Sequence, residues 1–426
     1  MENKKNTSPW AWIPSLYVAE GLPNITITVV SVALYTKMGL SVVEISFYTS
    51  LLYLPWVIKP IWSPFVDILK TKRWWILITQ LLIGAGFAGV AFSISTPFYL
   101  QATIAFFYLL AFSSATHDIA ADGFYMLELD TNQQAAFVGI RNAFYRVATL
   151  IGQGLLLYMA GYLERVTGNI KFAWSSVFFT MAGLFILFNF YHRFALPKPA
   201  LAAPSKNLKV HIILKEFFKT FVSFFTKPQL FAALFFMLTF RIGESQLQKL
   251  IIPFLDAPVE KGGLGLAMED IGIIYGTVGI IALMLGGIIG GIAASRGGLK
   301  KWLWPMTFSM ILTCLSFVYL SFVQPESLLV INICVVIEQF GYGFGFTAYV
   351  LYLIYFSEGE HKTSHYAICT GFMALGLALP GMIAGWIQNL LGYNHFFIWV
   401  MICSIIPIIA VSLLKIDPEY GKKKEK

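Results

Sequence analysis

The chain has 426 residues, of which 58% are hydrophobic and only 12% are charged, and its formal net charge is +8. Soluble globular domains carry about 25% charged residues, so the composition excludes an ordinary soluble protein and predicts a polytopic membrane protein. The basic residues follow the loops between apolar segments and match no recognition fold, which excludes a nucleic-acid-binding protein.

About twelve apolar segments follow one another along the chain, and several exceed the roughly 20 residues that cross a bilayer. They lie near 10–36, 42–64, 74–95, 98–126, 134–162, 172–194, 228–256, 268–294, 302–322, 327–356, 363–390 and 394–415. Most lysines and arginines outside the segments fall in alternate loops, and the other loops hold Lys37, Arg165, Lys171 and Lys261. The positive-inside rule therefore predicts a multi-pass membrane protein with both termini in the cytoplasm.

Two carboxylates, Asp118 and Asp122, lie inside the fourth segment and follow His117. An acidic side chain at the centre of a membrane helix costs about 2.5–3.5 kcal/mol. The two residues are four apart and project from one face of a helix, which must face protein, water or substrate. Because histidine titrates near neutral pH, His117 could help this pair to bind protons. The alternative is that its imidazole only supplies hydrogen bonds.

The fifth segment places arginines opposite these acids. Counted from the turn near Asp130, Asp118 lies at about the depth of Arg141, and Arg146 lies closer to mid-membrane. We therefore expect Asp118 to form an ion pair with Arg141 or Arg146. Such a pair could be purely structural.

The longest non-apolar interval divides the chain into two halves. It begins with Pro197 and Pro199, which are typical of a linker, and from Asn207 to Phe225 lysines alternate with apolar residues. This second part predicts an amphipathic helix on the cytoplasmic membrane surface. The predicted organisation is an N-terminal six-helix bundle at 1–194, a cytoplasmic linker at 195–227, and a C-terminal six-helix bundle with a basic tail at 228–426.

A short basic loop follows the second apolar segment of each half. The two loops contain Lys70, Lys72 and Arg73 in the first half and Arg296, Lys300 and Lys301 in the second. With six segments on each side of the linker, this repeat resembles the major facilitator superfamily. The resemblance implies an all-α fold of 12 transmembrane helices in two six-helix bundles.

The seventh segment carries a polar stripe, since Arg241, Glu244, Ser245 and Gln248 share one helical face and are typical of cavity lining. Arg241 is always charged and is a candidate to hold an anionic substrate group. Glu244 either neutralises the charge of Arg241 or takes part in proton coupling. Glu338 lies midway along the tenth segment and is the lone-acid candidate for proton coupling in this half.

Glycines of the eighth segment predict helix packing. Gly286 and Gly290, like Gly287 and Gly291, form GxxxG pairs. The four cysteines of the chain lie inside apolar segments without metal or redox spacing. No metal and no cofactor are therefore expected.

Several short motifs, taken in their order along the chain, identify a narrower family. They are Glu20-Gly21-Leu22-Pro23, the run 54–64, Asp118 to Gly123, Tyr145-Arg146, Phe240 to Glu244, Glu338, and His365-Tyr366-Ala367. This order resembles the AmpG-type muropeptide permeases and the related acetyl-coenzyme A transporter family of the major facilitator superfamily. The resemblance implies a proton-coupled symporter of the bacterial cytoplasmic (inner) membrane. It would import peptidoglycan-derived fragments of the anhydro-muropeptide or amino-sugar type for recycling.

The resemblance and the buried charges together give the candidate site residues. Those for substrate binding are Arg146, Arg241, Tyr145, Gln248 and Glu20. Those for proton coupling or gating are Asp118, Asp122, Glu338, Glu244 and His117. We expect a monomer that binds a small, anionic, sugar-containing substrate, protons and membrane lipids.

The chain departs from the family pattern at positions that bear on the substrate. His117 and His365 stand where the family usually has glutamine, and Phe124 to Met126 replace a basic residue often found there. A transporter of an acyl-coenzyme A or another anionic metabolite is therefore an alternative. A transporter-like sensor is an alternative of another class, although no soluble output domain is evident. The sequence shows no nucleophile paired with a base, so we do not expect an enzyme.

Overall fold

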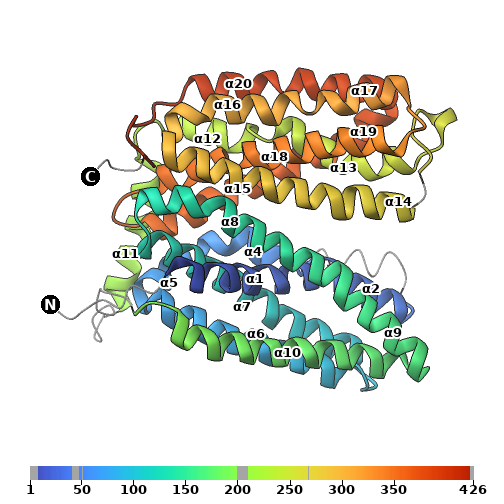
Figure 1. Cartoon of the computed structure of the whole chain (residues 1–426). Coiled ribbons are helices and arrows are strands. Elements are labelled where there is room, and N and C mark those ends of the chain that lie inside the picture. The colour runs from blue at the N-terminus through green and yellow to red at the C-terminus, as the bar shows by residue number, and fades with distance from the viewer. Residues whose placement is uncertain (1–7, 41–47, 50, 199–209, 267, 423–426) are drawn as a thin grey trace. The chain divides into compact units, whose positions relative to one another are not determined.

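The computed structural model describes residues 8–40, 48–49, 51–198, 210–266 and 268–422, and each regular element in these residues is a helix (Figure 1). In this part of the chain, ten helical segments are long and apolar enough to cross a membrane. The predicted all-α membrane fold is therefore confirmed. Residues 199–209 of the predicted linker and residues 423–426 of the predicted basic tail lie outside the described residues.

The helices follow the apolar segments closely. Before the linker they are α1 (Ile13–Ile25), α2 (Ser31–Lys37), α4 (Leu54–Ile58), α5 (Ser63–Leu69), α6 (Lys72–Ser93), α7 (Tyr99–Glu128), α8 (Thr131–Leu150), α9 (Leu157–Thr167) and α10 (Ile170–Ala195). After it they are α11 (Val210–Phe225), α12 (Leu230–Thr239), α13 (Ile242–Asp256), α14 (Met268–Ile273), α15 (Ile280–Gly297), α16 (Leu299–Leu312), α17 (Leu315–Val323), α18 (Leu328–Ser357), α19 (Lys362–Cys403) and α20 (Ile405–Ser412). Turns of π-helix at Thr26–Val30, Ile151–Leu156 and Ile274–Gly279 join α1 to α2, α8 to α9 and α14 to α15.

One of the twelve predicted spans takes an unexpected form. The second is broken into α4, a 3-10 turn at Lys59–Ile61, and α5. Its prolines at 55, 60 and 64 remove backbone donors and prevent a continuous helix. The last two spans meet at a sharp kink at Gly392, between the predicted segments 363–390 and 394–415. Gly392 has φ 70° and ψ 169°, a conformation open mainly to glycine.

The chain forms two compact units. Unit 1 comprises 1–128, 144–221 and 361–367, and unit 2 comprises 129–143, 222–360 and 368–426. In unit 1, α6 packs against both α7 and α10 around a core that includes Phe87, Phe107 and Phe178. In unit 2, α18 packs against α15 and α16 (Figure 1), and its core includes Phe254, Phe317 and Phe397. Each unit thus has its own hydrophobic core.

The glycine pairs of the eighth segment lie at helix contacts, as the sequence predicts. A Cβ atom at Gly286 would lie 2.2 Å from the Phe340 carbonyl oxygen of α18, and one at Gly290 would lie 2.8 Å from Thr347 Oγ1. These glycines therefore allow α15 and α18 to approach closely.

We expect Gly286→Ala to destabilise the protein by about 1–3 kcal/mol, because α15 must move away from α18. The melting temperature of the purified variant measures this effect. The control is Gly183→Ala in α10, since a Cβ atom at Gly183 would meet nothing within 4 Å. Equal melting temperatures for both variants would contradict the prediction.

Candidate functional site

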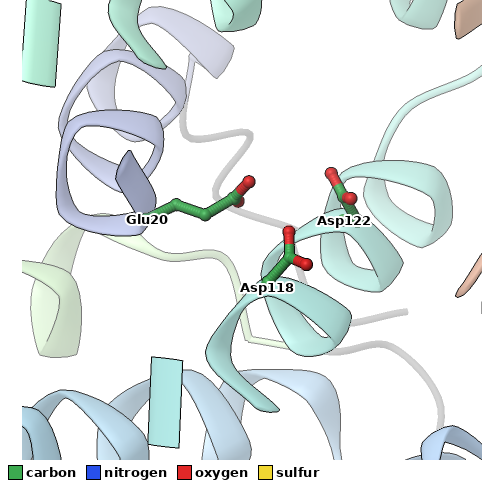
Figure 2. Close-up of side chains that lie close together, drawn as sticks. All are labelled: Glu20, Asp118 and Asp122. Atoms are coloured by element: carbon green, nitrogen blue, oxygen red, sulfur yellow. The ribbon is translucent and has the colours of Figure 1, made fainter. Parts of the chain in front are cut away.

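Three carboxylates from two helices of unit 1 form an acidic cluster. Glu20 projects from α1, and Asp118 and Asp122 project from adjacent turns of α7; Figure 2 shows the three side chains turned toward one another. One oxygen of each group lies within 4.8 Å of the others. Glu20 and Asp122 are each 6% exposed. The predicted common face of Asp118 and Asp122 is therefore present, and it meets an acid of α1.

Lys59 partly compensates this negative charge. It occupies the break between α4 and α5, and its Nζ forms an ion pair with Asp118 Oδ2. Lys59 also interacts electrostatically with Asp122 and Glu20. The Tyr17 hydroxyl of α1 donates a hydrogen bond of 3.0 Å to Asp122 Oδ1. The cluster is thus held by groups from α1, α7 and the broken second span.

The predicted pairing of Asp118 with Arg141 or Arg146 is wrong, because Lys59 is its ion-pair partner. The prediction measured depth along two straight helices and could not foresee that prolines break the second span beside Lys59. Arg141 belongs to unit 2. Arg146 is half-buried on α8 in unit 1, and its neighbour Tyr145 interacts electrostatically with Glu20 and Asp118.

The acidic cluster concentrates negative charge in a small volume. Two ionised carboxylates 4.8 Å apart repel each other by about 3 kcal/mol at an effective dielectric constant of 20. Protonation of one carboxyl group removes this repulsion. The spacing also suits a metal ion, but the Lys59 ammonium lies against Asp118, where such an ion would bind.

His117 interacts electrostatically with Asp118 and also takes part in a buried hydrogen-bond network in unit 1. Its Nε2 lies 3.1 Å from Gln80 Nε2, which lies 2.8 Å from His192 Nδ1. His192 Nε2 in turn lies 2.9 Å from Ser15 Oγ. The network joins α1, α6, α7 and α10, so His117 acts here as a hydrogen-bonding group that holds helices together.

Arg241 of unit 2 lies where the seventh span is interrupted between α12 and α13, with φ −102° and ψ 14°. Its Nε donates a hydrogen bond of 2.8 Å to Glu244 Oε2, and its Nη2 donates one of 2.9 Å to the Tyr342 hydroxyl. The guanidinium carbon also lies 5.0 Å from the ring centre of Phe346, within cation–π range. Arg241 is thus fully engaged within unit 2.

Two further predicted residues lie in unit 2. Glu338 of α18 is 1% exposed, and its Oε2 accepts a hydrogen bond of 2.8 Å from Gln339. It also interacts electrostatically with Glu244. Gln248 is half-buried on α13, one turn beyond Glu244.

Sequence reasoning missed the partners of the predicted charges. The sequence analysis did not predict that Lys59 and Tyr17 contact the acidic cluster. It also did not predict that Tyr342 and Phe346 surround Arg241. Lys59 carried a usable signal, since it is a lysine inside an apolar segment. The aromatic residues carried none, because aromatic side chains are common in membrane helices.

The fold and the buried charged sites together define a class, that of multi-pass helical membrane transporters. The family model described as the Major Facilitator Superfamily matches residues 16–357. The chain belongs to this superfamily; it is a transporter and not an enzyme.

Relatives of this chain support the narrower resemblance. The putative transporter AmpG 4 of Rickettsia conorii (strain ATCC VR-613 / Malish 7) is 26% identical over 404 residues, which cover 92% of each chain. The anhydromuropeptide permease of Escherichia coli (strain K12) is 24% identical over 413 residues, which cover 95% of this chain and 79% of the relative. The predicted resemblance to AmpG-type permeases is therefore confirmed.

A solved structure is similar in fold. The crystal structure of the Major Facilitator Superfamily transporter FucP in the outward conformation aligns with a TM-score of 0.66 and 14% identity. The alignment covers 95% of this chain and 98% of FucP. At this identity the likeness supports the fold alone.

Proposed function

We propose that this protein is a proton-coupled secondary transporter that imports peptidoglycan-derived fragments across the bacterial cytoplasmic membrane. It works as a monomer with both termini in the cytoplasm. The observation that carries proton coupling is the acidic cluster, where three carboxylates within 4.8 Å share the Lys59 ammonium. The substrate proposal is supported by the AmpG-type relatives, one of which is named an anhydromuropeptide permease.

The candidate residues divide between the two units. In unit 1, Asp118 and Asp122 exchange the proton, and Glu20, Tyr145 and Arg146 contact the substrate beside them. This assignment is supported by the electrostatic interaction of Tyr145 with both Glu20 and Asp118. A substrate group held next to the cluster would change its charge balance, which couples substrate binding to proton binding.

In unit 2, Arg241 and Gln248 provide a second contact for the substrate. Arg241 is bound to Glu244 in the structure, so an anionic substrate group must compete with that carboxylate. Protonation of Glu244 would release Arg241 for such a group. Glu338 lies within electrostatic range of Glu244 and is the second acid proposed for coupling in this unit.

The experiment is uptake of labelled anhydro-muropeptide into proteoliposomes that contain the purified protein. An imposed inward proton gradient is expected to raise the internal label well above the external level, and a protonophore is expected to abolish this accumulation. Empty liposomes are the control. Accumulation that ignores the protonophore would contradict proton coupling, and a lack of any protein-dependent uptake would contradict the substrate.

A further inference from the structure

Two aromatic side chains at the broken second span of unit 1 form a stacked pair. The ring centres of Tyr53 and Trp56 lie 5.6 Å apart, and the ring planes differ by 22°. Trp56 is 8% exposed and belongs to the hydrophobic core of unit 1, whereas Tyr53 is 39% exposed. The pair is therefore a flat aromatic surface that the core supports from behind and that a ligand can reach through Tyr53.

The backbone at the start of α4 holds this surface in place. Tyr53 is the residue just before α4, and its carbonyl oxygen accepts a hydrogen bond of 3.2 Å from the Trp56 backbone nitrogen. Pro55 lies in the first turn of α4, where its ring restricts the backbone angle φ. An aromatic ring on such a fixed segment loses little conformational entropy when a ligand binds to it.

Tyr53 lies beside the acidic cluster of unit 1. It is within electrostatic range of Tyr145, which also interacts with three charged residues, Glu20, Asp118 and Arg146. In addition, α4 packs against α7, the helix that carries Asp118. Because charged side chains in membrane spans face protein or a water-filled cavity, the surroundings of Tyr53 are polar. A polar ligand at the candidate site can therefore contact the Tyr53 ring.

An aromatic face next to carboxylates suits a sugar ring. One face of a pyranose presents C–H groups whose hydrogens are slightly positive, and the face of an aromatic ring is slightly negative. The edge of the sugar carries hydroxyl groups, which can donate hydrogen bonds to carboxylates such as that of Glu20. A lipid tail would contact the aromatic face equally well but has no donor for a carboxylate. The combination therefore favours a sugar.

We propose that Tyr53, supported by Trp56, binds a sugar ring of the substrate by stacking against its C–H face. This inference rests on the proposed function, because it states how the sugar part of that substrate is held. Tyr53 binds the ring, and the charged residues beside it bind the polar substituents. Tyr53 thereby makes the site selective for ligands that carry a sugar ring.

The first test measures sugar binding by the purified full-length protein in detergent. The probe for isothermal titration calorimetry is the disaccharide of N-acetylglucosamine and anhydro-N-acetylmuramic acid, which lacks the peptide. Tyr53→Leu keeps an apolar side chain but removes the ring, and it should weaken disaccharide binding about tenfold. Tyr53→Phe keeps the ring and should bind the disaccharide like the parent protein. The melting temperature of each variant shows whether its fold is intact.

The matched control is Tyr158→Leu in α9. Tyr158 and Tyr162 form another stacked pair of unit 1, with ring centres 6.3 Å apart, and Tyr158 is 70% exposed. This variant should bind the disaccharide like the parent protein. Equal affinities of Tyr53→Leu and the parent would overturn the proposal. An equal loss in Tyr53→Phe and Tyr53→Leu would also overturn it, since the hydroxyl group and not the ring face would then make the contact.

The second test separates this inference from the proposed function. In proteoliposomes, Tyr53→Leu should raise the KM for labelled anhydro-muropeptide and keep the maximal rate. A lower maximal rate with an unchanged KM would overturn the stacking proposal alone, since Tyr53 would then only support the fold. Disaccharide binding that depends on Tyr53, without proton-driven uptake by the parent protein, would contradict the proposed function and leave the stacking proposal supported.

Discussion

Replacement of Asp122 by asparagine is expected to abolish uphill uptake driven by a proton gradient, while exchange of substrate across the membrane continues. Asparagine can still accept the hydrogen bond that the Tyr17 hydroxyl donates to Asp122. It cannot take up a proton or repel the carboxylates of Glu20 and Asp118. The substitution therefore removes the proposed proton site with little change in packing.

The measurement compares two assays in the same proteoliposomes. Accumulation of labelled anhydro-muropeptide under a proton gradient should fall to the level seen with a protonophore, and counterflow into preloaded liposomes should persist. The control is Asp130→Asn, because Asp130 is exposed and its Oδ1 accepts a backbone hydrogen bond that asparagine can also accept. Unchanged accumulation by Asp122→Asn would assign Asp122 a structural role only.

The largest effect on stability is expected at Lys59. Lys59→Met leaves the carboxylates of Glu20, Asp118 and Asp122 without the ammonium that forms an ion pair with Asp118. The Lys59 and Asp118 side chains are 9% and 13% exposed, so solvent screens the loss poorly. Breaking a buried ion pair from one side costs about 3–5 kcal/mol. We expect a destabilisation of this size for Lys59→Met.

A second substitution should reverse part of this loss. Asp118→Asn removes one of the repelling charges, so the double variant Lys59→Met/Asp118→Asn should be more stable than Lys59→Met alone. The midpoint of SDS-induced unfolding measures all three variants against the parent protein. Additive losses would show that the ion pair contributes nothing as a pair.

Another ion pair of unit 1 provides the reference for the stability loss of Lys59→Met. Lys37 and Glu164 lie 3.2 Å apart, but the Lys37 side chain is 54% exposed. Exposed pairs contribute up to about 1 kcal/mol, so Lys37→Met should have a much smaller effect than Lys59→Met. Similar losses for the two variants would mean that burial of the Lys59–Asp118 pair is unimportant.

The sequence by itself determined the class of this protein. Apolar segments long enough to cross a bilayer permit only helices, because backbone groups in lipid must satisfy one another within the segment. The common face of Asp118 and Asp122 followed from their spacing of four residues, which the helical period fixes locally. The order of short motifs was sufficient to identify the AmpG-type resemblance, which the relatives confirm.

Only the tertiary structure decided which charges meet. Lys59 pairs with Asp118 because prolines break the second span at that depth, and no count along straight helices reveals such a break. His117 contacts Gln80, and Gln80 also contacts His192 of α10, which lies 75 positions after His117 in the chain. Ion pairs and cavities depend on how separate helices are rotated and shifted against each other. Hydrophobic patterning fixes which face of a helix is buried but leaves its partner open.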